Sequence, residues 1–337
     1  MNKLLALGIA LVLAGQVLAQ QKPQYTQYTL NNYLLNPAIS GIEDYADLKL
    51  GTRHQWSGLE GAPQSYYATF HMPINKDVVS YRGARTGAVA KEASTKRTNV
   101  YRRARPHHGV GAMAMSTKTG PLKRGSLSFS YAYHQPLSQR LRVAAGVAPG
   151  LIQYSLDPGA VTLVNSNDPA IHDGRINEVK FDLNMGLWLY SEYFYLGVAG
   201  SQLVPSKREY ISTGSPEYND GRLQQHYFVT GGFRMDMSSY LSVIPSVMVK
   251  MAQPSPASVD ANVKVLYANR LWAGVSYRHQ ESVAAMAGIN VNHLFDLAYS
   301  YDASTSPLGR SNAGSHEVVL GFKLRNTRKI LCPEWAW

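Results

Sequence analysis

The chain has 337 residues and a formal net charge of +11, yet only 16% of its residues are charged, against about 25% in a typical soluble domain. Its 45% content of hydrophobic residues and its 22 tyrosines exclude a disordered chain. Its one cysteine excludes an intramolecular disulfide framework and a zinc finger built on cysteines.

The first residues have the pattern of an export signal. Lys3 supplies a positive charge, the run from Leu4 to Val17 is apolar and uncharged, and Ala19 completes the small-residue pattern that precedes signal peptidase cleavage. We expect 1–19 to be a signal peptide and the mature chain to begin at Gln20. The run is too short to favour an uncleaved anchor, and no later stretch of about 18 uncharged apolar residues predicts a transmembrane helix. Such a chain is periplasmic, secreted or a transmembrane β-barrel.

Residues 20–44 precede the first predicted strand. Between Asn31 and Gly41 this segment contains Leu34, Leu35 and Pro37, which makes it too apolar for a free tail. We interpret 20–44 as a periplasmic or plug segment that packs into or under a barrel.

From residue 45 to residue 324 the chain alternates between apolar and polar side chains with a period of two. In one example, Leu127, Phe129, Tyr131 and Tyr133 alternate with Ser126, Ser128, Ser130 and Ala132. Segments of about 9–11 residues with one apolar face are typical of membrane barrels, whereas the strands of a soluble sandwich are shorter. The predicted segments are 45–56, 65–73, 108–117, 125–135, 140–154, 179–190, 193–203, 225–235, 240–251, 257–267, 270–279, 282–291, 294–302 and 315–324. We therefore predict an all-β fold, a transmembrane antiparallel β-barrel of about 14 strands spanning 45–324.

Several of these segments close on a tyrosine. The tyrosines concerned are Tyr133, Tyr190, Tyr267, Tyr277 and Tyr301. Such positions fit the aromatic girdles of a membrane barrel, although in a soluble protein they would be core edges.

Loop lengths predict the orientation of the barrel. With the mature N-terminus in the periplasm, alternate connections at 136–139, 191–192, 237–239, 268–269 and 292–293 become periplasmic, and all are tight. The outward set includes the long connections 155–178, 204–224 and 303–314, as expected for an outer-membrane barrel. The exception is 74–107, which is the longest connection and yet is predicted to be periplasmic.

That long connection is strongly basic. Between residues 76 and 105 only Asp77 and Glu92 oppose nine basic residues, which are Lys76, Arg82, Arg85, Lys91, Lys96, Arg97, Arg102, Arg103 and Arg105. The run is either a solvated loop or a periplasmic surface that docks an acidic protein partner or anionic lipid headgroups. The tail 325–337, also predicted to be periplasmic, adds Arg325, Arg328 and Lys329. No nucleic-acid recognition motif accompanies this charge.

The chain resembles the PorP/SprF family of outer-membrane proteins of the type IX secretion and gliding machinery. The matching runs are 24–28, 35–38 with Gly41, 53–63, 245–247, Asp260, 271–278, 299–302, 314–317 and 332–333. They bracket most of the mature chain, and their order and spacing carry the resemblance. The basic run 76–105 is not part of it.

The resemblance implies a non-enzymatic barrel without cofactors, integral to the outer membrane, that is not a general porin. It further implies that the protein receives or anchors exported surface proteins, such as gliding adhesins with a type-specific C-terminal signal domain, and couples to periplasmic components. The implied partners are type IX components, exported cargo and outer-membrane lipid, and not nucleic acid. The rival interpretations are a porin or transporter for hydrophobic or small solutes and an outer-membrane hydrolase.

Candidate functional side chains are few. Arg278, Asp302 and Glu317 lie on polar faces near strand ends, where they either pair with other lumen residues or shape a cargo-binding mouth. His316 and Glu317 are adjacent and point to opposite faces of a strand, so they cannot share a metal. No serine, histidine and acid set predicts catalysis, and no ligand spacing predicts a metal. A compact turn is expected at Trp56, Gly58, Gly61 and Pro63, either as a rigid hairpin or as an outer lip that contacts cargo.

Overall fold

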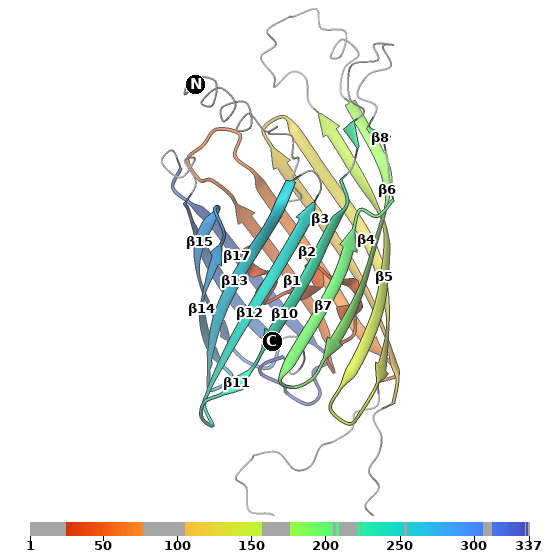
Figure 1. Ribbon diagram of the computed structural model, residues 1–337, viewed down its shortest axis with the longest axis vertical. Coiled ribbons are helices and arrows are strands. Elements are labelled where there is room, and N and C mark those ends of the chain that lie inside the picture. The colour runs from red at the N-terminus through yellow and green to blue at the C-terminus, as the bar shows by residue number, and fades with distance from the viewer. Residues whose placement is uncertain are drawn as a thin grey trace, which may run out of the picture.

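The computed structural model describes residues 25–76, 105–156, 176–204, 207–208, 221–222, 224–252, 255–305, 312–333 and 335. Within these residues, fourteen long antiparallel strands form one closed sheet (Figure 1). They are β1 (Ala46–His54), β2 (Gln64–Ile74), β3 (His107–Thr119), β4 (Leu122–Pro136), β5 (Arg142–Leu156), β6 (Ile176–Tyr190), β7 (Phe194–Ser201), β10 (His226–Phe233), β12 (Leu241–Ala252), β13 (Ser255–Tyr267), β14 (Leu271–Arg278), β15 (Ser282–Asn290), β16 (Phe295–Ser304) and β17 (Ser315–Leu324).

Two strand pairings close the barrel. The first strand, β1, pairs with the last, β17, in a register that sets Ala46 against Leu324 and Arg53 against Glu317. On the far side, β10 pairs with β12 and sets His226 against Ala252. The prediction of a fourteen-stranded antiparallel barrel is confirmed.

The structure also contains three two-residue strands that the sequence does not predict. β11 (Met235–Asp236) extends the turn before β12, and β8 (Lys207–Arg208) pairs with β9 (Gly221–Arg222) apart from the barrel. None of the helices in the described part of the chain is long and apolar enough to cross a membrane.

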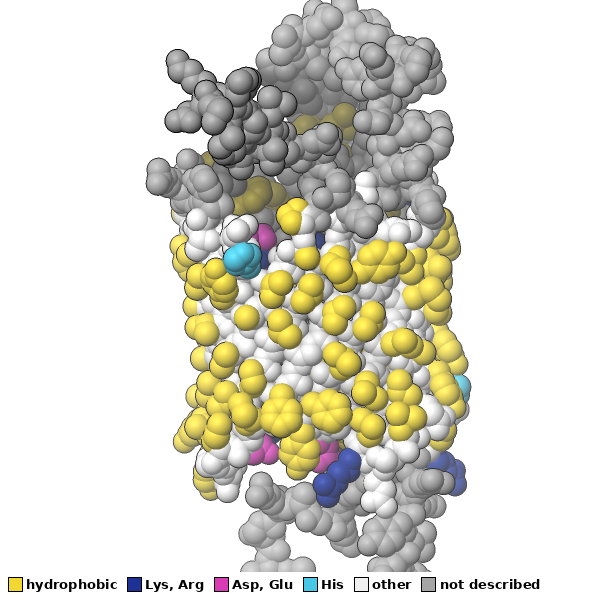
Figure 2. Space-filling model, viewed as in Figure 1, with side chains coloured by type: hydrophobic (Ala, Val, Ile, Leu, Met, Phe, Trp, Pro, Cys, Tyr) yellow, Lys and Arg dark blue, Asp and Glu magenta, His cyan; other side chains and the backbone are white. Residues whose placement is uncertain are grey.

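The period of two in the sequence becomes the two faces of the wall. Phe129 on β4 is 61% exposed, while its neighbours Ser128 and Ser130 are buried in the lumen. The outer surface is covered by apolar side chains, with charged side chains gathered toward the rims in the face that Figure 2 presents. Such a wall is stable in a lipid bilayer because its apolar side chains face the hydrocarbon. Its backbone polar groups are satisfied by hydrogen bonds between strands.

One member of the expected aromatic girdle faces the wrong way. Tyr133, Tyr267, Tyr277 and Tyr301 are exposed on the outer surface, but Tyr190 is fully buried in the lumen. Tyr190 follows Leu189, and adjacent strand residues point to opposite faces. The assignment of Tyr190 to the girdle was therefore wrong.

The two ends of the barrel differ. The connections 137–141, 191–193, 234–240, 268–270 and 291–294 all lie at one end, here called the lower end as Figure 1 is drawn. The opposite, upper end carries the connections after β1, β3, β5, β7, β12, β14 and β16. The expected grouping of tight turns at one end is therefore present in the strand order.

The residues before β1 run through the inside of the barrel. They form three 3₁₀ turns, η1 (Thr26–Thr29), η2 (Asn32–Leu34) and η3 (Pro37–Ile39), visible as the red-to-orange coils within the wall (Figure 1). We call residues 25–45 the lumen segment. Its side chains are almost all buried, and its apolar members pack on wall residues such as Trp188 and Phe228.

Candidate functional site

A buried ion cluster in the upper half of the lumen joins the lumen segment to the wall. Arg53 on β1 contacts Asp302 on β16 at 2.5 Å and Glu317 on β17 at 3.1 Å, and all three side chains are at most 3% exposed. The β1–β17 register brings Arg53 opposite Glu317, although 264 residues separate them in the chain. Buried carboxylates are stable only with such compensation.

The same carboxylates hold the start of the lumen segment. The backbone N–H of Thr26 donates to Glu317 Oε2 at 2.8 Å, and its hydroxyl donates to Asp302 Oδ2 at 2.6 Å. Tyr67 donates from its hydroxyl to the other oxygen of Glu317 at 2.9 Å. The cluster therefore fixes both the closure of the barrel and the position of Thr26.

In the lower half of the lumen the segment packs against glycines of the wall. A Cβ atom on Gly109 of β3 would lie 1.7 Å from the carbonyl oxygen of Ser40, and one on Gly186 of β6 would lie 2.0 Å from Asn36 Oδ1. Asn36 Nδ2 donates to the carbonyl of Leu187 at 2.9 Å, and thereby ties the segment to the backbone of β6. Only glycine permits this approach of two backbones.

Two stacked histidines bind the backbone just beyond this contact. The rings of His107 and His134 lie 4.3 Å apart and nearly parallel. Their Nε2 atoms lie 3.1 Å from the carbonyl of Gly41 and 2.7 Å from the carbonyl of Ser40. Since a carbonyl oxygen only accepts, both Nε2 atoms carry the donated proton. The pair is thus a clamp on the lumen segment.

At the lower end the segment meets the C-terminal tail. The carboxylate of Asp44 accepts from Lys76 at 2.7 Å and also contacts Arg328, while Lys76 donates to the carbonyl of Ile42 at 2.6 Å. Trp335 donates its backbone N–H to Glu43 at 3.0 Å, and the guanidinium of Arg142 lies 4.2 Å from the centre of its ring. The lumen segment and the C-terminal tail are therefore bonded to each other at the lower end.

Asp44 makes the lower contact dependent on pH. Burial alone would raise the pKa of Asp44, but Lys76 and Arg328 hold the pKa of this carboxyl below its usual value. A lowered pKa stabilises the fold above the unfolded-state pKa of about 3.9, and that stabilisation is lost as the pH falls through the folded-state pKa. We expect Asp44→Asn to cost about 2 kcal/mol at pH 7. The cost should shrink below pH 4, as measured by urea unfolding in lipid vesicles, and a cost equal at pH 7 and pH 3 would contradict the pairing.

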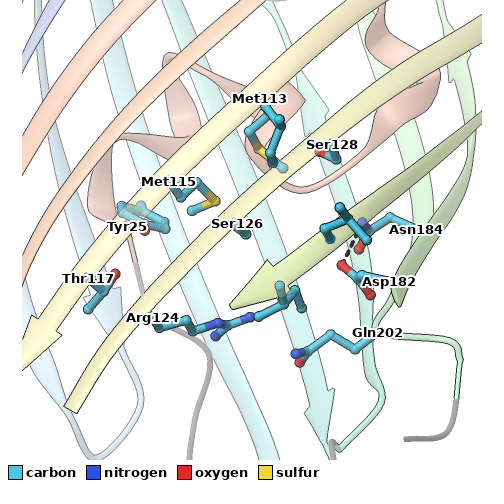
Figure 3. A pocket seen from close by; sticks show the side chains of 13 residues that line it. Tyr25, Met113, Met115, Thr117, Arg124, Ser126, Ser128, Asp182, Asn184 and Gln202 are labelled. Atoms are coloured by element: carbon cyan, nitrogen blue, oxygen red, sulfur yellow. Dashed lines mark hydrogen bonds between the residues drawn. The ribbon is translucent and has the colours of Figure 1, made fainter. Parts of the chain in front are cut away.

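Cavities remain on both sides of Tyr25. The one in Figure 3 lies between the lumen segment and β3 to β6, with about 470 Å³ of space between atoms, a figure that includes space open to solvent. Met113 and Met115 line one part of it, and Arg124, Asp182 and Asn184 line another. Asn184 donates to Asp182 at 3.1 Å, as the dashed line shows. The cavity is therefore lined by both apolar and polar side chains, and it lies near the upper end of the barrel.

The candidate polar residues from the sequence all lie in the lumen, but in two groups. Asp302 and Glu317 share Arg53, whereas Arg278 pairs with Asp260 at 3.0 Å and approaches Glu281 at 3.7 Å. Glu317 is buried inside, while the neighbouring His316 lies outside and meets the hydroxyl of Tyr299 at 2.7 Å. His107 and His108 are likewise on opposite faces, since His108 contacts Tyr131 on the exposed surface. Within the described residues no cluster of three potential metal ligands occurs.

The turn between β1 and β2 is held from both sides. Trp56, Gly58 and Gly61 have positive φ angles of 52°, 93° and 69°. Gln55 donates its N–H to the carbonyl of Pro63 at 2.9 Å, and Ser57 exchanges backbone hydrogen bonds with the residues 313–314. Its role as a lip for cargo stays a prediction.

Most of the basic run lies outside the described residues. This applies to Arg82, Arg85, Lys91, Lys96, Arg97, Arg102 and Arg103, and also to the signal peptide. Of the nine basic positions the structure describes Lys76, which is paired to the lumen segment, and Arg105, which is exposed just before β3.

Comparison with known proteins identifies the family of this chain. A family model described as "Type IX secretion system membrane protein PorP/SprF" matches residues 17–322. No curated protein matches. Solved structures with some similarity include a Pseudomonas aeruginosa FadL homologue (11% identity, 89% of this chain and 93% of that chain, TM-score 0.47). Others are the Pseudomonas putida toluene transporter TodX (9%, 90% and 94%, 0.46) and the Acinetobacter baumannii outer membrane protein Omp33 (6%, 85% and 100%, 0.45).

The sequence identities and TM-scores of these structures are too low to support an argument. The fold assignment therefore rests on the strand pairing of this chain. The family match, by contrast, covers nearly the whole barrel and begins before the lumen segment. The chain therefore belongs to the PorP/SprF family of type IX secretion system membrane proteins.

Proposed function

We propose that this protein is a non-enzymatic outer-membrane component of the type IX system that receives or anchors exported surface proteins and couples to periplasmic components. The observation that carries the proposal is the lumen segment, which is bonded to the wall from Thr26 near the upper end to Asp44 at the lower end. A lumen occupied by the barrel's own chain favours a role at the surfaces and mouths of the barrel over free passage of solutes. Adhesins with a type-specific C-terminal signal domain are the proposed cargo class.

The rival function is a porin or transporter for hydrophobic or small solutes. It requires a continuous path through the lumen, and the contacts of Asn36, Ser40 and Gly41 with the wall lie across that path. A transporter would have to break these contacts in every cycle. Solute uptake by vesicles that contain the purified barrel would favour the rival.

Purification in mild detergent followed by identification of bound proteins tests the proposal. We expect a type IX component and an exported surface protein to accompany the barrel in reproducible proportion. A second barrel of similar abundance, isolated in the same way, serves as the control. A bare barrel, or the same companions on the control barrel, would count against the proposal.

The basic run 76–105 is the proposed docking surface for a periplasmic partner. Lys76 and Arg105 stand at the lower end, and with the tight turns facing the periplasm the run 76–105 begins and ends there. Replacing Arg102, Arg103 and Arg105 with Gln should leave barrel assembly intact and weaken capture of a periplasmic partner. The loss should be larger at low salt, where the attraction between wild-type charges is less screened. Equal yields of the same partners would mean that the run is a solvated linker.

A further inference from the structure

A second cavity lies on the other side of Tyr25, between the lumen segment and strands β10, β12, β13 and β14. About 430 Å³ of space lies between its atoms, and this figure includes space open to solvent. Its apolar lining includes Tyr28, Leu34, Leu35, Phe228 and Met248. Ser258, which is only partly buried, also lines the cavity near the upper end of the barrel.

Lys250 brings a positive charge into this apolar cavity. Its side chain lines the space and the residue is 7% exposed, yet it makes no hydrogen bond or ion pair to any described residue. The nearby carboxylates are engaged elsewhere, because Asp260 pairs with Arg278 at 3.0 Å and Glu281 approaches the same guanidinium at 3.7 Å. The cavity thus contains an ammonium group with spare donors.

The other buried lysines of the lumen show what is missing here. Lys49 pairs with Asp47, and Lys323 lies 3.7 Å from Asp296 and donates to Asn290 at 3.3 Å. Lys264 donates to the carbonyl of Thr29 at 3.4 Å and lies over the ring of Trp272. Burying an ammonium without a partner is costly, so an unpartnered lysine in a cavity marks a place for an anion.

We propose that this cavity binds a small carboxylate carried on a compact apolar or aromatic body. The carboxylate would accept from Lys250 Nζ, and the body would lie among Phe228, Tyr28 and Met248. A thioether beside aromatic rings favours an aromatic guest, and a charge-assisted hydrogen bond in a site of low dielectric supplies specificity for the anion. The inference goes beyond the export function and does not depend on it.

Binding of 4-fluorophenylacetate to the full-length barrel in lipid nanodiscs, followed by ¹⁹F NMR, tests the proposal. We expect saturable binding of one molecule per barrel, absent from empty nanodiscs. Lys250→Met should weaken it by at least about tenfold, as expected for the loss of a charged hydrogen bond. Lys250→Arg should retain most of the affinity, and the neutral 4-fluorophenylacetamide should bind both wild type and Lys250→Met equally weakly.

Lys123→Met is the matched control, since Lys123 is exposed on β4 at the same end of the barrel and does not line the cavity. It should leave the affinity unchanged. Lys250→Met removes no bond within the described chain, so the barrel should keep its heat-modifiable migration on gels. Equal affinity in wild type and an assembled Lys250→Met variant, or no saturable binding to wild type, would overturn the proposal.

Discussion

Replacing Arg53 with methionine should lower the free energy of unfolding of the barrel by about 3–5 kcal/mol, as found when one partner of a buried ion pair is removed. The side chain is 3% exposed and is the shared partner of Asp302 and Glu317. Without it two buried carboxylates face each other across β16 and β17, and Thr26 donates to both of them. We therefore expect the pairing of β1 with β17 and the contacts of Thr26 to weaken together. Urea unfolding in lipid vesicles measures the resulting change in the free energy of unfolding.

Two further variants separate this effect from a general loss of arginine. Arg140→Met, in the exposed turn after β4, should change the free energy of unfolding by less than about 0.5 kcal/mol. Adding Glu317→Gln to Arg53→Met removes one uncompensated charge and should recover part of the loss. An Arg53→Met barrel as stable as wild type would show that the cluster does not hold the structure together.

Replacing Gly109 with alanine should cost about 3 kcal/mol or release the lumen segment, because the added methyl group overpacks a close contact. The new Cβ atom would stand 1.7 Å from the carbonyl oxygen of Ser40, and no side-chain rotation can relieve a clash between two backbones. His107 and His134 hold the same stretch from the neighbouring positions. Unfolding measurements and limited proteolysis of the folded barrel distinguish destabilisation from release.

Gly125→Ala is the matched control for this change. Gly125 lies on β4, and a Cβ atom there would have one neighbour, Gln153 Cβ, at 4.0 Å. It should therefore leave stability and protease resistance close to wild type. If Gly109→Ala behaves like Gly125→Ala, the segment does not occupy the lumen as described.

The strands could be predicted from the sequence because their signal is local. Alternation over ten residues, as at Phe129 and its serine neighbours, reports directly on a wall with lipid on one side. The prediction for Tyr190 was wrong because a position at the end of a strand does not by itself decide which face a side chain occupies. Residue parity alone places Tyr190 inside, against Trp335 and His134.

The partners within the lumen could not be predicted, because they depend on register. Parity places Asp302 and Glu317 inside, but their common partner Arg53 is set by the closure of β1 on β17. No local pattern distinguishes Arg53, which belongs to the run 53–63 that carries part of the family resemblance. The contact of Ser40 with Gly109 depends on the path of the lumen segment, and no period in the sequence reports that path. The surroundings of Lys250 likewise depend on the packing of the barrel in three dimensions, which no local pattern in the sequence reports.

The central claim is that the barrel's own chain fills its lumen, and current through the purified wild-type protein in planar lipid bilayers tests this most directly. We predict that inserted barrels stay closed, with no sustained ohmic current, and that Gly109→Ala opens them if it releases the lumen segment. A sustained open-channel current through the wild-type barrel would contradict the account, whatever Gly109→Ala does.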